Sequence, residues 1–186
     1  NGREDDNYHP GVDVLEIDIR YGVEENGRVA VRLAHVNYTC VLATFLLNLG
    51  TIVVAGAGAI RGVNVVYSIY NIIIYGIVGM YAFYNGYKGM ATRNGRLTDQ
   101  YVGLQALALV FMFAASIASG ANYHGWTNVA RASASPRMRD FWVGWSYFEA
   151  TVWTLDYLVG GVALYKVVIN RKDALRGGGG LSGFRL

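Results

Sequence analysis

Hydrophobic residues gather into four long runs along this chain. The runs cover roughly residues 38–60, 65–84, 102–121 and 141–169. A helix rises ~1.5 Å per residue, so ~20 residues cross a hydrocarbon layer ~30 Å thick. The sequence therefore predicts an all-α integral membrane protein with four transmembrane helices. The connection at residues 62–64 is so short that the first two helices must form an antiparallel hairpin, and we expect an antiparallel bundle with short loops.

The segments outside the runs are polar. Residues 1–37 form a polar N-terminal segment, in which residues 12–21 alternate between apolar and charged side chains and predict a short strand. Residues 85–101 make a polar, basic loop, and residues 170–186 a flexible, basic C-terminal tail with four consecutive glycines. The chain opens at Asn1 and not at Met, so we expect residues to be missing before it, through processing or truncation.

Small and polar residues recur at alternating steps of three and four within each run, which places each set on one helical face. In lipid, helices associate through small residues that permit close approach and polar residues that bond across. These faces should therefore turn inward, with Gly79 among the packing positions. The third run carries a second small pair, Ala114 and Ala118, on an outward face, and we expect it to contact partners.

The fourth run contains two acidic residues, Glu149 and Asp156, seven positions apart on one helical face. A charge in mid-membrane costs ~3 kcal/mol on insertion scales, so we expect these carboxyl groups to have bonding partners or a function that offsets the cost. One hypothesis is that they bond to polar residues of the other inward faces and fix the rotation of the helices; the other is a proton or cation path. The expected intramembrane polar network comprises Glu149, Asp156, Asn48, Thr51, Asn71, Tyr75 and Gln105, with Asn48, Thr51 or Tyr75 as the expected partners of Asp156.

Composition and charge limit the classes of function. Hydrophobic residues make up 53% of the chain and charged residues 16%, which is too apolar for a soluble domain of this size. The basic residues lie in loops and tails, where they suit lipid head groups and not nucleic acid. Their distribution, ten against four, places both termini and the second loop on the cytoplasmic, matrix or stromal side. His9, His35 and His124 lie outside the runs, and the sequence shows no catalytic set, metal motif or cofactor motif.

The chain resembles the secretory carrier membrane proteins, a family of four-span vesicle proteins, over roughly residues 38–172. The resemblance begins with the sequence Phe-Leu-Leu-Asn-Leu at residues 45–49, continues in the stretch from Tyr84 to Arg93, and includes Gly125-Trp126 and Tyr165-Lys166. The Arg-Pro of the family's loop is Asn85-Gly86 here, and the Asn-Pro-Phe repeats are missing. The resemblance implies that the loop after the second span contacts lipid head groups. The residues that it places there, together with a neighbouring arginine, are Tyr87, Lys88, Arg93 and Arg96.

These observations favour a non-enzymatic tetraspan protein that acts by helix packing and by contact with lipids and with membrane proteins or further copies of itself. The resemblance suggests vesicle traffic in endomembranes. An accessory subunit of a respiratory, photosynthetic or ATP synthase complex in an organelle inner membrane is the alternative. A second alternative, proton or ion conduction, depends only on Glu149 and Asp156.

Overall fold

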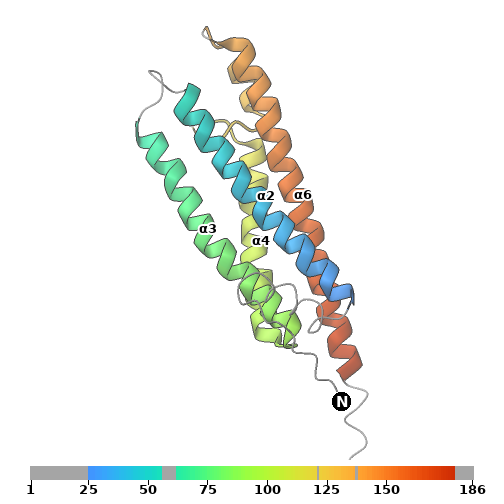
Figure 1. The fold of residues 1–186 in the computed structure, drawn as a ribbon. Coiled ribbons are helices and arrows are strands. Elements are labelled where there is room, and N and C mark those ends of the chain that lie inside the picture. Colours follow the sequence, from blue (N-terminus) through green and yellow to red (C-terminus); the bar gives the residue numbers. More distant parts are fainter. Residues whose placement is uncertain (1–24, 56–61, 121, 137, 179–186) are drawn as a thin grey trace, which may run out of the picture.

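Four long helices lie side by side in the computed structural model, which describes residues 25–55, 62–120, 122–136 and 138–178 (Figure 1). They are α2 (Glu25–Ala55), α3 (Gly62–Ala91), α4 (Gly95–Ile117) and α6 (Arg139–Gly178), and a short helix α5 (Asn128–Ser133) lies between the last two. All four long helices are long and apolar enough to cross a membrane. The chain is therefore all-helical over the described ranges, and its four apolar helices suggest a multi-pass membrane protein. The strand expected at residues 12–21 lies outside the described residues.

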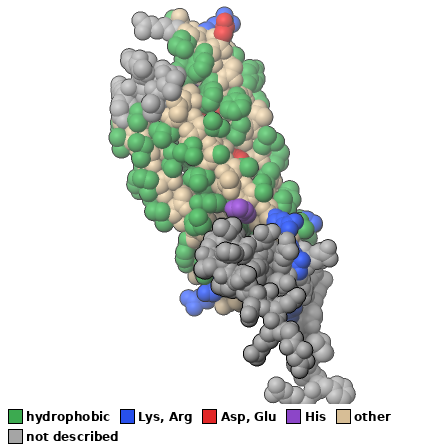
Figure 2. All heavy atoms as spheres, viewed as in Figure 1, with side chains coloured by type: hydrophobic (Ala, Val, Ile, Leu, Met, Phe, Trp, Pro, Cys, Tyr) green, Lys and Arg blue, Asp and Glu red, His purple; other side chains and the backbone are tan. Residues whose placement is uncertain are grey.

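The bundle is a four-cornered ring. Helix α2 packs against α3 and α6, and α4 packs against the same two helices, so α3 and α6 stand on a diagonal and barely touch. Consecutive long helices run antiparallel (Figure 1). The N-terminal ends of α2 and α4 therefore meet the C-terminal ends of α3 and α6 at one end of the bundle, which we name the basic end. Its described basic residues are Arg28, Arg32, Lys88, Arg93, Arg96, Lys166, Arg171 and Lys172, and Figure 2 shows basic groups near both ends of a largely hydrophobic face.

At the basic end, all four long helices extend beyond the predicted spans. Helix α2 begins at Glu25 and not at residue 38, because Ala30, Val31 and Ala34 recur at helical spacing and bury one face. The C-terminal segment expected from residue 170 begins inside α6, which runs to Gly178. Val167 of α6 packs in the same cluster as Ala30 and Val31. Helix packing outside the hydrophobic runs therefore keeps these polar segments helical.

The basic loop expected at residues 85–101 is mostly helical as well. Helix α3 continues to Ala91 and α4 starts at Gly95, which leaves a three-residue turn with Arg93 in the left-handed region at φ 52°. The Asn94 side chain caps α4 by accepting hydrogen bonds from the backbone N–H groups of Arg96 and Leu97. Gly86 and Gly89 let the two helices approach: a Cβ at Gly86 would lie 2.7 Å from the Tyr101 ring.

Over the described residues, most positions of the inward faces predicted from residue spacing are buried or half-buried, although Ser119 is exposed. Two hydrophobic clusters form the core, one at the basic end around Tyr101 and Val167, and one in the opposite half around Phe45, Met112 and Trp153. Polar members of the predicted faces are buried beside them: Thr44, Asn48, Thr51, Ser68, Gln105, Glu149 and Asp156. Helical period alone places these residues inside, because it fixes which side chains share a face.

Candidate functional site: a polar network across the bundle

The Glu149 carboxylate is the most heavily hydrogen-bonded side chain of the bundle interior. Its side chain is 3% exposed. Oε1 accepts hydrogen bonds from Asn48 Nδ2 at 2.7 Å, from the His124 backbone N–H at 3.3 Å and from Trp153 Nε1 at 3.3 Å. Oε2 accepts from Trp145 Nε1 at 2.8 Å and lies 2.9 Å from His124 Nδ1. Donors therefore surround both oxygens, as an ionised buried carboxylate requires.

His124 reaches Glu149 because the chain folds back after α4. The N–H of Gly125 donates to the Ala118 carbonyl at 2.7 Å, and the N–H of Trp126 donates to the Ser116 carbonyl at 2.8 Å. Gly125 has to be glycine at this crossing, since a Cβ would lie 2.4 Å from the Ser116 oxygen. The fold-back turns the His124 ring into the bundle, where it stacks on Trp142 at 5.5 Å between ring centroids. With Glu149 ionised, the Nδ1 atom of His124 carries the proton of this hydrogen bond.

The network continues from Glu149 to the other helices. Asn48 of α2 also donates to the Asn122 carbonyl at 2.7 Å and accepts from the Ser68 hydroxyl of α3 at 3.4 Å. The Asn122 side chain donates to the Asn64 carbonyl at 2.8 Å. Glu149 is thereby connected to α2, to α3 and to the loop after α4. Because these groups are buried, any change in helix rotation would leave several of them unpaired.

Tyr123 adds a further tie beside this network. Its hydroxyl accepts a hydrogen bond from Asn71 Nδ2 of α3 at 2.5 Å. Burial, reinforced by the nearby negative charge of Glu149, raises the pKa of Tyr123 to about 12, although the bond from Asn71 opposes the rise. The phenol is therefore neutral at physiological pH. Its ring lies edge-on to Phe111 and Trp153 in the hydrophobic cluster of this half of the bundle.

Asp156 has a much sparser environment than Glu149. Its side chain is 4% exposed, and its Oδ2 atom lies 2.7 Å from the Thr44 hydroxyl of α2. The same hydroxyl lies 3.0 Å from the Cys40 carbonyl. The expectation that Asp156 bonds to Asn48, Thr51 or Tyr75 was wrong. Asn48 serves Glu149, Thr51 donates to the Leu47 carbonyl of its own helix, and Tyr75 packs against the rings of Tyr38 and Phe45.

A second chain of hydrogen bonds crosses the bundle near Asp156. Gln105 Nε2 of α4 donates to Asn37 Oδ1 of α2 at 2.8 Å, and Asn37 Nδ2 donates to the backbone carbonyl of Asp156 at 2.9 Å. Gly160 permits this crossing, since a Cβ there would lie 3.0 Å from the amide nitrogens of both Asn37 and Gln105. The chain ties α2, α4 and α6 together at a second level. Asn37 was missed from the sequence because it lies just before the first hydrophobic run.

The predicted head-group residues divide into two environments. Tyr87 is 8% exposed and belongs to the core cluster at the basic end, so it does not face outward as expected. Lys88, Arg93 and Arg96 are exposed there. The Lys88 ammonium lies 5.7 Å from the centroid of the Tyr84 ring. The correction for Tyr87 follows from the extension of α3, which places this side chain in a helix interface and not in a loop.

The predicted packing residues also have different surroundings. At Gly79, an added Cβ would lie 3.0 Å from the Tyr38 ring, so this glycine permits close packing of α2 and α3. Ala114 is exposed on α4. Ala118 is half-buried and caps the end of α4 through a hydrogen bond from its N–H to the Ala114 carbonyl. The small pair therefore spans the end of the helix, which limits the surface it offers to another helix.

The arrangement is suited to holding helices in place. Within the described ranges, no group of three or more His, Cys, Asp or Glu side chains could hold a metal ion. Sequence reasoning missed His124 and Tyr123 as members of the network because both lie outside the hydrophobic runs. Comparisons with protein families, with curated proteins and with solved structures found no significant match to this chain.

Proposed function

We propose that this chain is a non-enzymatic four-span membrane protein that acts through lateral contacts with lipids and with other membrane proteins. The observation that carries the proposal is that hydrogen-bond donors of the protein occupy both carboxylate oxygens of Glu149. Five donor groups from two helices and one loop surround its carboxylate. A carboxylate used as a base or as a carrier of protons needs an acceptor site that a substrate or water can reach. The Glu149 environment supports a structural lock instead.

The distribution of charge supports one orientation. Eight described basic side chains gather at the basic end, whereas Arg131 and Arg139 lie toward the other end. Under the positive-inside rule, this distribution favours the cytoplasmic, matrix or stromal side for the basic end, and with it the orientation in which both termini face that side. Cysteines introduced at Thr92, in the turn between α3 and α4, and at Ser133, in α5, should then label from opposite sides of a sealed vesicle in a background without Cys40. Labelling of both from the same side would contradict four spans.

The outer face of α3 supports action by lateral contact. Its exposed apolar residues recur at alternating steps of three and four, which is the spacing of a helix-pairing seam. They are Val63, Val66, Tyr70, Ile73, Ile77, Met80 and Tyr84, each more than half exposed. Tyr70 and Tyr84 carry hydroxyl groups, and such groups gain from a hydrogen-bonding neighbour in a membrane. A partner helix or lipid head groups would supply one.

The cellular setting is proposed from the family resemblance. The features shared with secretory carrier membrane proteins favour vesicle traffic in endomembranes. The polar hydroxyl groups on the exposed α3 face favour the second candidate, an accessory subunit of a larger bioenergetic complex, because a permanent protein neighbour would satisfy them. Proton or ion conduction is the weakest candidate, because Glu149 is enclosed by fixed donors.

Purification from the native membrane in mild detergent separates these candidates. A photo-crosslinking residue at Ile77 should capture lipid or a neighbouring protein, whereas the same residue at the buried Val167 should yield only crosslinks within the chain. Capture of electron-transfer or ATP synthase subunits at Ile77 would decide for the accessory subunit. Proton or ion flux into protein-containing vesicles, above that of protein-free vesicles, would contradict the proposal.

A further inference from the structure

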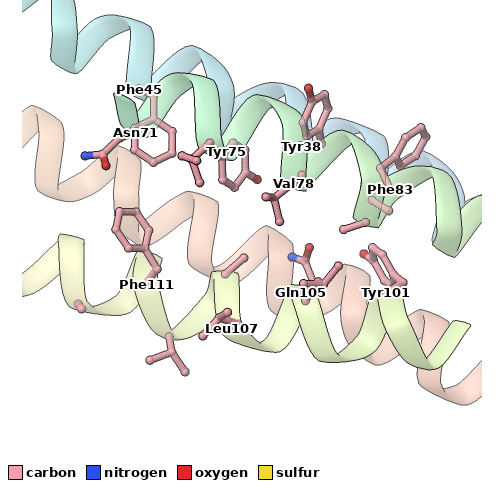
Figure 3. Close-up of a pocket in the computed structure, with 18 residues that line it drawn as sticks. Tyr38, Phe45, Asn71, Tyr75, Val78, Phe83, Tyr101, Gln105, Leu107 and Phe111 are labelled. Carbon is pink, nitrogen blue, oxygen red and sulfur yellow. The ribbon is translucent and has the colours of Figure 1, made fainter. Parts of the chain in front are cut away.

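An apolar groove lies between α3 and α4, with α2 behind it (Figure 3). Its volume is about 380 Å³. Ile74 and Val78 of α3 and Leu107 and Val110 of α4 are at least 40% exposed and lie at its opening, and Tyr38 and Phe45 of α2 form part of the wall. The groove therefore opens on the outer surface of the bundle, where lipid would lie if the chain spans a membrane.

The shape of the groove fits a single hydrocarbon chain. On α4 its lining runs from Tyr101 to Ala114, thirteen helical steps or ~20 Å along the helix axis. One water molecule occupies ~30 Å³ in the liquid, so the groove has room for about a dozen groups of that size. A helix with its side chains is ~10 Å wide and does not fit such a space. A flexible acyl chain does.

Tyr101, which lines the groove, carries a buried hydroxyl that lacks a partner in the described part of the chain. Tyr101 is 2% exposed, and its hydroxyl oxygen makes no hydrogen bond there. Figure 3 shows the Tyr101 ring projecting from α4 toward α3, one helical turn from Gln105. Gly86 admits the ring by leaving no Cβ in its way. Buried hydroxyl groups are nearly always hydrogen-bonded, so an acceptor is expected at this position.

The place of Tyr101 along the groove indicates where a polar group would lie. Tyr101 is six residues from the start of α4, at the basic end of the bundle. In a membrane this is the level of the interface, where tyrosine is enriched and where the polar part of a lipid begins. From that level the groove runs toward Ala114 and so toward the membrane interior. The exposed Lys88 lies at the same end, where it suits a phosphate.

We propose that the groove between α3 and α4 binds one acyl chain of a membrane phospholipid, whose ester carbonyl accepts a hydrogen bond from the Tyr101 hydroxyl. The proposal rests on the proposed insertion into a membrane. It assigns the groove one occupant because the wall is mostly apolar and the unpaired donor lies at its interfacial end. The bound phospholipid would fill the space between α3 and α4 as part of the folded protein.

The test uses the full chain in vesicles of phosphatidylcholine and phosphatidylglycerol, extracted in mild detergent, with retained phospholipid measured by native mass spectrometry. The wild-type chain should retain about one phospholipid. In Tyr101→Phe the affinity for the retained phospholipid should fall about two- to tenfold, which corresponds to the loss of one hydrogen bond.

Ala108→Phe should fill the groove and abolish retention. Tyr165→Phe and Ala106→Phe are the matched controls, because both residues are exposed and lie outside the groove lining, and they should behave as the wild type.

A second readout separates binding from folding. After delipidation, Tyr101→Phe should be at least as stable as the wild type, because it removes a buried hydroxyl without a partner. Equal retention by Tyr101→Phe and the wild type would overturn the role of the hydroxyl. Equal loss in Ala106→Phe and Ala108→Phe would overturn a specific groove, and a dimer that only Ala108→Phe dissociates would assign the groove to a second copy. A chain that an alkaline wash removes from membranes would refute insertion itself and not only the groove.

Discussion

The Nδ1 atom of His124 lies 2.9 Å from Oε2 of Glu149, although the two residues are 25 positions apart and belong to a loop and a helix. Both side chains are buried, at 8% and 3% exposure. The contact connects the fold-back after α4 to the network that also holds Asn48 and Ser68. The loop is therefore part of the packed bundle, and the stability of the bundle should depend on the chemistry of a single carboxylate.

Glu149→Gln should destabilise the protein. An amide has one acceptor and one donor end, and both carboxylate oxygens of Glu149 face donors. In either orientation the new NH₂ group meets an N–H that cannot accept, such as Trp145 Nε1 or Asn48 Nδ2. We expect the free energy of unfolding to fall by about 1–3 kcal/mol. Each kcal/mol should lower the melting temperature by about 2–4 °C, measured by thermal unfolding in detergent.

The control for this variant is Asp140→Asn, since Asp140 is an exposed acid near the start of the same helix. It should shift the melting temperature little. A Glu149→Gln protein as stable as the control would show that the carboxylate is not the centre of the network.

Asp156→Asn, in contrast to Glu149→Gln, should leave the stability of the protein nearly unchanged. The single hydroxyl proton of Thr44 can serve either the Cys40 carbonyl or Asp156 at one time. An Asn side chain would donate to the Thr44 oxygen and leave the Thr44 proton for Cys40, so both contacts would be kept. Asp156→Leu lacks this bond and should reduce assembly. If Asp156→Asn abolished a measured proton or ion flux in a folded protein, conduction would replace the structural role.

The inward faces were predictable from the sequence because they depend only on the helical period. Asn48, Ser68, Gln105 and Glu149 all recur with small residues at steps of three and four, and all four are buried. The identity of each partner was not predictable. It depends on how far one helix is shifted along another, which is why Asp156 meets Thr44 and not Asn48. That shift is set by side-chain packing between the helices, and the residue spacing within one helix does not determine it.

The ends of the helices were less predictable than their middles. Residues 25–37 and 85–101 contain enough polar side chains to read as loops, yet both are largely helical. Their helicity depends on packing between segments far apart in the sequence, such as those that bring Ala30 and Val167 into one cluster. The contact of His124 with Glu149 has the same origin, since a fold-back brings it about and residue spacing does not encode it.

The stability contributed by Tyr123 should fall at high pH. Its pKa is raised from 10.0 to about 12 in the folded chain, first by burial and then by the charge of Glu149. Between these values the unfolded chain has lost the phenol proton and the folded chain keeps it, so folding takes up a proton and stability falls as pH rises. Tyr123→Phe cannot titrate there. Its deficit against the wild type, about 0.5–1.5 kcal/mol at neutral pH from the lost bond to Asn71, should shrink from pH 10 to 12 in denaturant titrations. A constant deficit would contradict the raised pKa.

Gly160→Ala and Gly161→Ala should change stability in opposite directions. At Gly160 a Cβ would lie 2.9 Å from Leu109 and 3.0 Å from the amide nitrogens of Asn37 and Gln105, so alanine would push α6 from α2 and α4 and strain the second chain of hydrogen bonds. At Gly161 a Cβ would meet nothing within 4 Å, and alanine there gains the ~1 kcal/mol of helix propensity that glycine lacks. Thermal unfolding of the two variants in one detergent compares the same substitution at adjacent residues. We expect Gly160→Ala to lose about 1–3 kcal/mol, as overpacking does, and Gly161→Ala to equal or exceed the wild type. If Gly160→Ala were as stable as Gly161→Ala, α6 would not approach α2 and α4 as closely as this crossing requires.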